Sequence, residues 1–311
     1  MLPTLERWTD EGLRAAVAIL IGTEGSAPLE PGAAFAVSER GDVAGTVTGG
    51  CVEPALYEEA QAILAGAPAR RITYGVADEE AFEVGLPCGG TVHVFVTAID
   101  PALVRELAAA VADERPVALE VPLDGAPLRL VPAEDASAST PGLFVLSVAP
   151  PPRLFVVGAI DHAAALAAAG RLLGYRVTVC DPRPRFLTRE RFPAADELAV
   201  DWPDRVLARE TLDERSAVCV LTHDPKLDVP ALRAALASPA GYVGAMGGKR
   251  TTAARLERLR GEGVSEEDLA RIHAPIGLDL GAKTPAEVAV AVAAELVALA
   301  RVRTPAEATA G

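Results

Sequence analysis

Two cysteines lie beside paired glycines and are the residues of this sequence best suited to thiol chemistry. Cys51 stands in the segment TGGCVEP and Cys88 in the segment LPCGG. The glycines beside them are Gly49, Gly50, Gly89 and Gly90. Because glycine lets a ligand approach the backbone closely, both thiols are candidate site residues. Cys51 also precedes an expected helix start, a position that favours thiolate. The alternative is that both are small buried residues in glycine turns.

Glu53 follows Cys51 by two positions and has two interpretations. It is either the cap of the helix expected after Pro54 or a polar group of the same site. The other cysteines, Cys180 and Cys219, end or lie within apolar stretches and are expected in the core. No two cysteines form a C-x-x-C pair, and the histidines show no H-x-x-x-H spacing. The sequence therefore predicts no metal site.

The apolar residues 154–157 are followed by GAIDHA, where a Rossmann fold carries G-x-G-x-x-G/A. Gly158 supplies the first glycine, but Ile160 replaces the second, which normally lets the backbone approach a pyrophosphate. Asp161 places negative charge where a phosphate would sit, and it is suited to cap the helix instead. Asp181 ends the next strand, where an acidic residue would hold a ribose hydroxyl. The pattern predicts a Rossmann frame and argues against ordinary NAD(P) binding.

The segment THDPK follows the apolar stretch AVCVL and should lie at the carboxyl edge of the sheet, where open α/β folds bind ligands. His223 and Asp224 together are able to move a proton. The alternative is that Asp224 and the following proline only turn the chain.

The segment GAMGGKRT also follows a strand and opens a helix. Its candidate binding residues are Gly247, Gly248, Lys249 and Arg250. Glycines ahead of a helix with two cations beside them favour an anion cradle, although the spacing is not that of a P-loop. The alternative is an ordinary glycine turn with two solvated cations.

Regular alternation of strands and helices marks the second half of the chain. The expected strands are 154–157, 175–180, 218–221 and 242–244, and the expected helices are 161–174, 228–237, 251–260 and 284–301. The last helix has a capping box, with Thr284 as N-cap and Glu287 three positions on. This alternation predicts an α/β fold with a doubly wound parallel sheet covered on both faces.

The first half is less regular and predicts a mixed α+β domain. Expected strands are 15–21, 34–37, 71–74, 92–96 and 117–121, with helices after Pro54 and over 101–114. Three consecutive prolines at 150–152 form a stiff extended connection. We therefore expect two domains, 1–149 and 150–311.

Composition limits the functional classes. The chain has 311 residues, a net charge of −14 and 50% hydrophobic residues, which excludes disorder throughout. The acidic balance argues against binding nucleic acid or an anionic membrane. The N-terminus is not a signal peptide, and no apolar stretch is long enough to span a bilayer. We expect a soluble cytoplasmic protein.

The motifs, taken in order, resemble the XdhC/CoxI family of xanthine dehydrogenase accessory proteins. The similar segments are EGSAPLEPGAAFAV, GTVTGGCVEPALYEEA, LPCGGTVHVFV, LGYRVTVCDPRPRF, RFPAADEL, LTHDPKLDVPAL, YVGAMGGKRT and APIGLDLGAKTPAEVAVAVAAEL. The resemblance implies an XdhC/CoxI-type N-terminal domain, a Rossmann-like C-terminal domain and usually a homodimer.

The resemblance also implies a maturation factor rather than an enzyme. Such a protein binds the molybdenum cofactor (molybdopterin) transiently, supports its sulfuration with a cysteine desulfurase and inserts it into an apo molybdenum hydroxylase such as xanthine dehydrogenase. Carried over by position, Cys51, Glu53 and Cys88 match the N-terminal motifs. The Rossmann motifs are matched by Asp181, His223, Asp224 and the GAMGGKR segment, whereas GAIDHA and His93 depart from the family pattern.

A physical interpretation of these residues accompanies the family role. The GAMGGKRT segment is able to hold the phosphate of a pterin cofactor, and thiolates at Cys51 and Cys88 suit its soft metal–sulfur chemistry. Two alternatives remain: an NAD(P)-dependent oxidoreductase, and a nucleotide-sensing module without chemistry of its own.

Overall fold

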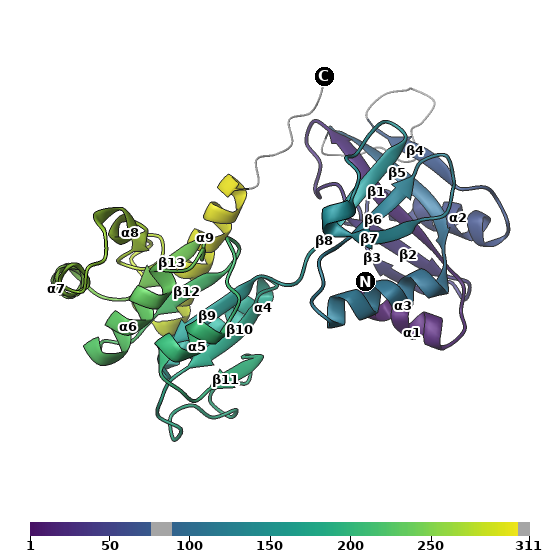
Figure 1. Cartoon of the computed structure of the whole chain (residues 1–311). Coiled ribbons are helices and arrows are strands. Elements are labelled where there is room, and N and C mark those ends of the chain that lie inside the picture. Colours follow the sequence, from purple (N-terminus) through teal and green to yellow (C-terminus); the bar gives the residue numbers. More distant parts are fainter. Residues whose placement is uncertain (76–88, 304–311) are drawn as a thin grey trace. The chain divides into compact units, whose positions relative to one another are not determined.

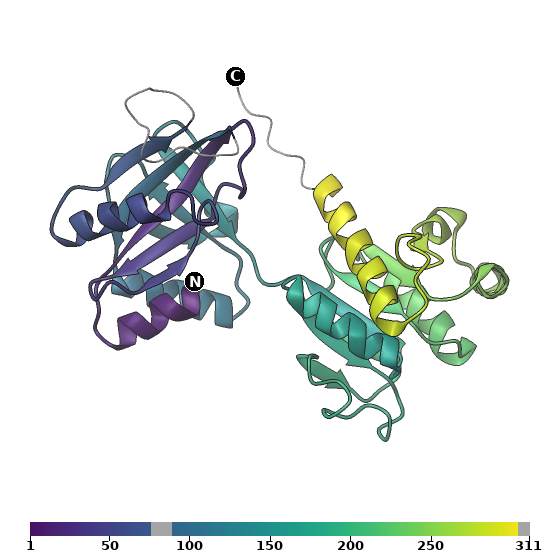
Figure 2. The ribbon, with the colours of Figure 1, turned by 180° about the vertical axis from the view of Figure 1, so that it is seen from behind.

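The computed structural model describes the backbone of residues 1–75 and 89–303, and contacts divide the chain into two units, Met1–Pro150 and Pro151–Gly311 (Figures 1 and 2). The junction falls within the prolines 150–152. Each of the described hydrophobic clusters draws its residues from one unit. The units are therefore described one at a time.

The first unit is built on an antiparallel sheet in the order β3-β2-β1-β5-β4. Its strands are β1 (Ala15–Glu24), β2 (Ala34–Ser38), β3 (Val43–Gly45), β4 (Arg70–Tyr74) and β5 (Thr91–Ile99). A second sheet has the order β7-β6-β8, with β6 (Val117–Pro122), β7 (Arg129–Pro132) and β8 (Leu143–Val148). The helices are α1 (Leu2–Asp10), α2 (Glu53–Leu64) and α3 (Pro101–Ala112), with the 3₁₀ turn η1 at Ala133–Asp135.

Alternation along β1 explains the layers of the first unit. Ala16, Ala18 and Leu20 face a core that α2 covers through Leu56. The intervening Val17 and Ile19 face a second core, which includes residues of α1, α3 and β6. A strand with both faces buried needs apolar residues at successive positions, which is why residues 15–21 of β1 are all hydrophobic. Trp8 of α1 is almost fully buried in the second core.

The second unit is built on a parallel sheet in the order β11-β10-β9-β12-β13-β14. Its strands are β9 (Arg153–Val157), β10 (Arg176–Cys180), β11 (Glu197–Ala199), β12 (Ala217–Val220), β13 (Tyr242–Ala245) and β14 (Ile272–His273). The helices are α4 (Asp161–Leu172), α5 (Pro203–Arg209), α6 (Pro225–Leu236), α7 (Lys249–Gly261), α8 (Glu266–Ala270) and α9 (Pro285–Arg303). The structure thus confirms the predicted α/β class with a parallel, doubly wound sheet.

The helices of the second unit cover both faces of its sheet. Helices α4 and α9 contribute to one core and α5 to α8 to the other, as Figures 1 and 2 show from opposite sides. The chain leaves β9 first toward β10 and later returns to β12 on its other side. The strand order reverses between β9 and β12, and such a switch point is where open parallel sheets form ligand crevices. Trp202, half-exposed, precedes α5.

Helix starts show where sequence reasoning held and where it failed. The capping box of α9 is confirmed, because the Glu287 carboxylate accepts a hydrogen bond from the Thr284 backbone N–H at 2.9 Å. The prediction that Asp161 caps α4 is wrong. Ile160 occupies the N-cap, and Asp161 is the first helical residue, exposed and paired with Arg191 at 3.3 Å. A guanidinium partner outside the helix thus replaces the backbone donors that a cap would use.

The termini of elements account for most other differences. Helix α6 begins three residues earlier than predicted because the Asp224 side chain caps it, accepting from the Lys226 N–H at 3.0 Å. No clear sequence pattern marks α1, α5, α8 or the short strands. Among the described residues, no helix is both long and apolar enough to cross a membrane.

Candidate functional site

The glycine segment of the first unit closes around the carboxylate of Glu53. That carboxylate accepts hydrogen bonds from the backbone of Val47, Thr48 and Gly50, at 2.9, 2.8 and 2.8 Å. It also accepts from the hydroxyls of Thr46 and Thr48, at 2.5 and 2.8 Å. We call residues 46–52 the Glu53 loop. Because five donors converge on one carboxylate, Glu53 holds this loop together from the first position of α2.

The protonation of Glu53 follows from these contacts. Burial acts to raise its pKa, but the hydrogen bonds from Thr46, Thr48 and Val47 outweigh it and lower the pKa to about 2. Gly49 and Gly50 have φ values of +81° and +121°, while a Cβ at either position would meet nothing within 4 Å. Backbone conformation, not lack of space, therefore requires glycine here.

Of the two cysteines predicted as site thiols, the structure describes Cys51 only. Cys51 lies two residues before α2, is partly buried and packs against the core that α2 covers. Cys88 lies outside the described residues. Of the glycines that follow it, Gly89 has a φ of +76° and Gly90 is buried, where a Cβ would lie 2.2 Å from the carbonyl oxygen of Ser26. Gly90 is therefore required by a close backbone crossing with the loop after β1.

The two remaining cysteines are core residues, as predicted. Cys180 and Cys219 are at most 1% exposed. Burial raises the pKa of Cys180 to about 12, and it raises the pKa of Cys219 as well. Neither thiol is suited to nucleophilic chemistry.

The turn after β9 is closed by contacts within the chain. Gly158 has a φ of +113°, and a Cβ there would lie 2.5 Å from a methyl of Thr222. The backbone N–H of Ala159 donates to the Asp181 carboxylate at 2.8 Å, and Arg183 donates to that carboxylate through Nε and Nη2 at 2.8 and 2.7 Å. Asp181 is fully buried. Burial acts to raise its pKa, but the hydrogen bonds from Arg183 and Ala159 prevail and lower it.

These contacts give Asp181 a different role from the one its position in the sequence suggests. A ribose would have to displace Arg183 to reach the carboxylate. Ile160 packs against the core that α4 and α9 cover, which leaves a β-branched side chain in the place of the second fingerprint glycine. The turn therefore does not fit NAD(P).

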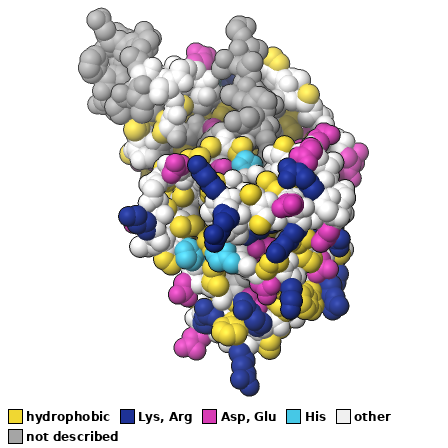
Figure 3. Space-filling model, turned by 90° about the vertical axis from the view of Figure 1, so that its left-hand side faces the viewer, with side chains coloured by type: hydrophobic (Ala, Val, Ile, Leu, Met, Phe, Trp, Pro, Cys, Tyr) yellow, Lys and Arg dark blue, Asp and Glu magenta, His cyan; other side chains and the backbone are white. Residues whose placement is uncertain are grey.

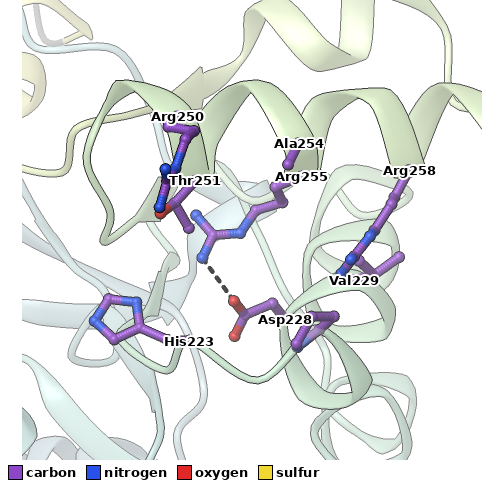
Figure 4. A pocket seen from close by; sticks show the side chains of 9 residues that line it. His223, Asp228, Val229, Arg250, Thr251, Ala254, Arg255 and Arg258 are labelled. Carbon is purple, nitrogen blue, oxygen red and sulfur yellow. Dashed lines mark hydrogen bonds and ion pairs between the residues drawn. The ribbon is translucent and has the colours of Figure 1, made fainter.

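A cavity of about 250 Å³ lies beyond the carboxyl ends of β12 and β13, between α6 and α7. Its lining includes His223, Pro225, Val229, Arg250, Ala254 and Arg258 (Figure 4). We call it the arginine pocket. Figure 3 views the chain from the side on which α7 lies in Figure 1 and shows numerous Lys and Arg side chains on that face.

A buried ion pair forms the inner wall of the pocket. Arg255 of α7 and Asp228 of α6 meet at 2.6 Å, with each side chain 4% exposed. Arg255 also donates to the carbonyl oxygen of Met246 at 3.1 Å and to that of Thr222 at 3.5 Å. It thereby joins the loops after β12 and β13 to α6. Burial raises the pKa of Asp228, although hydrogen bonds from Thr222 and Arg255 oppose the rise.

The sequence analysis did not identify this ion pair, and it identified only some of the other residues that line the pocket. His223 and Arg250 both line the pocket, whereas Asp224 caps α6. Gly248 is the N-cap of α7 and Lys249 its exposed first residue, next to the pocket in sequence but not in its lining. Gly247 has a φ of +152° where the chain enters α7. The sequence feature that would have identified Asp228 is a charged residue among the apolar, buried positions of α6.

The described part of the chain contains no cluster of three or more His, Cys, Asp or Glu side chains that could hold a metal ion.

Comparison with known proteins covers both units. Residues 154–296 match the XdhC Rossmann domain, and residues 8–75 match the XdhC and CoxI family. The molybdenum cofactor insertion chaperone PaoD of Escherichia coli (strain K12) is 30% identical over 291 residues, which span 93% of this chain and 84% of the relative. A probable xanthine dehydrogenase subunit of Bacillus subtilis (strain 168) is 25% identical, spanning 94% of this chain and 95% of the relative.

A solved structure has a similar fold. The crystal structure of a xanthine dehydrogenase from Bacillus halodurans superposes with a TM-score of 0.83 and 24% identity, covering 99% of this chain and 98% of the other. At this identity the likeness concerns the fold alone. The matches to both domain families and the relative at 30% identity lead to one conclusion: this chain belongs to the XdhC and CoxI family.

Proposed function

We propose that this chain is an accessory protein that carries the molybdenum cofactor and inserts it into a molybdenum hydroxylase. The observation that carries the proposal is the 30% identity, over 93% of this chain, to a relative named as a molybdenum cofactor insertion chaperone. The cofactor is cargo in this role, so the chain needs to hold it and release it rather than catalyse with it.

The arginine pocket supports the proposal from the structure. Molybdopterin ends in a phosphate, and an anionic end group needs local cations in a chain whose net charge is −14. Arg250 and Arg258 supply them around one cavity, which His223 also lines. On this proposal, the contribution of Lys249 and of the backbone at Gly247 and Gly248 is to complete the entrance to the pocket.

We propose a separate role for the first unit in sulfuration of the cargo, together with a cysteine desulfurase. Cys51 is partly buried, and the Glu53 loop fixes the backbone on which it stands. Soft thiolates suit molybdenum–sulfur chemistry. Cys88 is proposed as a second thiol for the same chemistry, on its sequence motif alone. Glu53, whose carboxylate is engaged by five donors, is assigned to positioning Cys51.

Activation of a client enzyme tests the insertion role. A molybdenum hydroxylase such as xanthine dehydrogenase, prepared without cofactor, is incubated with molybdopterin-loaded chain and then assayed. We expect activity to appear faster with the loaded chain than with the same amount of free cofactor. Equal rates would contradict insertion by this protein. Mass spectrometry of small molecules released from the chain, purified from a host that makes molybdopterin, tests the cargo directly.

Substitution of the thiol tests the sulfuration role. Cys51→Ser keeps the side-chain size and the Glu53 loop, so cofactor binding should persist while the transferred cofactor lacks its sulfido ligand. The desulfo form is measured by reactivating the client with sulfide, and Cys88→Ser is examined in parallel. An unchanged sulfido content in both variants would remove the thiols from the proposal. The homodimer is tested separately by light scattering of the purified chain.

A further inference from the structure

Two arginines of α7 stand over one cavity with a small residue between them. Arg250, Ala254 and Arg258 are spaced four residues apart and therefore lie on one face of the helix. Two helical turns separate the arginines, about 12 Å of helix rise. In Figure 4 they occupy the two ends of the pocket, with the methyl group of Ala254 between them.

Arg250 and Arg258 differ from other arginines around them in forming no ion pair with the described residues. On the same helix, Arg260 pairs with Glu266. On α6, Arg233 pairs with Glu262 at 2.9 Å. Within the described residues, Arg250 and Arg258 make no such pair. In a chain with 43 acidic residues against 29 basic ones, cations that stay unpaired around one cavity point to an anion from outside.

The remaining walls determine what kind of anion fits. The carboxylate in the lining, that of Asp228, is engaged by Arg255 and does not repel a ligand. Pro225 and Val229 of α6 form an apolar side, and Thr251 adds a hydroxyl. At about 250 Å³ the cavity is smaller than the 300–1,000 Å³ of whole-ligand pockets, so it suits an end group rather than a complete cofactor.

We propose that the arginine pocket binds the phosphomonoester end group of a small molecule, with Arg250 and Arg258 as its main contacts and His223 and Thr251 as further donors. A phosphomonoester carries close to two negative charges and three terminal oxygens, which matches two guanidinium groups. The pyrophosphate of a dinucleotide such as NAD⁺ carries substituents at both ends, so neither of its phosphates presents three terminal oxygens. The site is separate from the turn at Gly158, where Asp181 and Ile160 exclude a dinucleotide.

The inference rests on the proposed function only where it identifies this phosphate with that of the cargo; the preference for a phosphomonoester stands by itself. It is tested by isothermal titration calorimetry of the full chain at low salt. The probes are sn-glycerol 3-phosphate as monoester, NAD⁺ as dinucleotide and a hexaglutamate peptide as an acidic segment. We expect saturable binding of the monoester and at least tenfold weaker binding of the other two.

Variants connect the binding to the pocket. Arg250→Gln and Arg258→Gln should each weaken monoester binding about tenfold, because each removes a charge-assisted contact. Arg260→Gln on the same helix is the matched control, since it makes the same change in net charge outside the pocket. We expect it to leave the affinity unchanged. All three positions are exposed, so the fold should persist, as circular dichroism will verify.

Several outcomes would overturn the inference. They are the absence of monoester binding, equal binding of the peptide or of NAD⁺, and an equal loss in Arg260→Gln and Arg258→Gln. Failure of the inference and of the proposed function are distinguishable. A chain that activates a client but does not bind glycerol phosphate would refute the pocket and leave the carrier role, and molybdopterin that binds equally to wild type and to both pocket variants would refute only the link between the pocket and the cargo phosphate. If the pocket binds glycerol phosphate but the chain never activates a client, the proposed function would be refuted and the pocket would stand.

Discussion

The Glu53 loop and the segment that leads into α7 beside the arginine pocket have similar sequences and different structures. Each contains a glycine pair and precedes a helix, at TGGCVEP and at GGKRT. In the first, the chain supplies its own anion, and Glu53 satisfies the backbone and hydroxyl donors. In the second, the cations Arg250 and Arg258 surround an open cavity. A glycine motif therefore does not indicate a ligand until the partners of its neighbours are known.

The difference lies in where the nearest carboxylate stands. Glu53 is three positions beyond Gly50, at the first position of the helix that follows the loop. From there its side chain turns back into the loop. The carboxylate closest to the pocket, Asp228, is on another helix and is engaged by Arg255. The first region is thus complete within the chain, and the second is complete only with an external anion. The predictions below test this contrast, from the largest expected effect to the smallest.

Arg255→Leu should have the largest effect on stability. It leaves Asp228 as a buried carboxylate without its partner and removes the donor to the carbonyl oxygens of Met246 and Thr222. Breaking a buried ion pair from one side typically costs about 3–5 kcal/mol. Urea unfolding followed by circular dichroism measures the loss. In the double variant that also carries Asp228→Asn, part of the loss should return, and the absence of any recovery would show that the pair is not coupled.

Glu53→Ala should lower the free energy of unfolding of the first unit by about 2 kcal/mol at pH 7, because the carboxyl pKa shifts from 4.5 to about 2 on folding and solvent screening reduces the gain for a partly exposed side chain. The unfolded chain binds the proton more tightly, so this contribution is complete above pH 5 and is lost as the pH falls toward 2. In urea titrations, the difference between variant and wild type should therefore be similar at pH 7 and pH 5 and smaller at pH 3. A difference independent of pH would contradict the assignment.

Gly158→Ala should destabilise the second unit by about 2 kcal/mol, because a Cβ there meets Thr222 at 2.5 Å and φ is +113°. Gly49→Ala in the Glu53 loop is the matched control. It also requires a positive φ, but its Cβ has open space, so we expect about 1 kcal/mol. Thermal unfolding of both variants gives the comparison. Equal losses would show that backbone strain alone governs both glycines.

Arg250→Gln and Arg258→Gln should have the smallest effect on stability, within about 0.5 kcal/mol of wild type. Both side chains are exposed and make no ion pair with the described residues, so their removal leaves no buried group without a partner. Urea unfolding at pH 7 measures this. A loss above 1 kcal/mol would mean that these arginines stabilise the fold, and the contrast with Glu53 would fail.

The sequence predicts the second unit better than the first. Apolar strands of four or five residues alternate there with longer helices, and this pattern survives errors of a few residues at each end. The predicted start of α6 is three residues too late because an aspartate such as Asp224 occurs both in turns and as a helix cap. Only the tertiary structure shows that it is a cap here. In the first unit, β3 and β7 are short and half-exposed, so they leave little periodicity to recognise.

The site is predictable in part. His223 and Arg250 follow strands, and this alone places them at the carboxyl edge of a parallel sheet. Arg258 and the pair Arg255–Asp228 are not predictable in this way, because their role depends on how α6 and α7 pack against each other. The sequence does not distinguish between two roles of Asp181, because a buried carboxylate held by Arg183 and a carboxylate that binds a ribose would stand at the same position.

The position of the two tryptophans has a practical consequence. Trp8 is buried in the first unit, and Trp202 lies half-exposed in the second. The chain therefore carries one tryptophan in each unit, and Trp202→Phe isolates the tryptophan emission of Trp8. Since each described hydrophobic cluster belongs to one unit, the two halves can lose structure at different denaturant concentrations. Fluorescence then shows which half a given substitution has weakened, which an average over the whole chain cannot show.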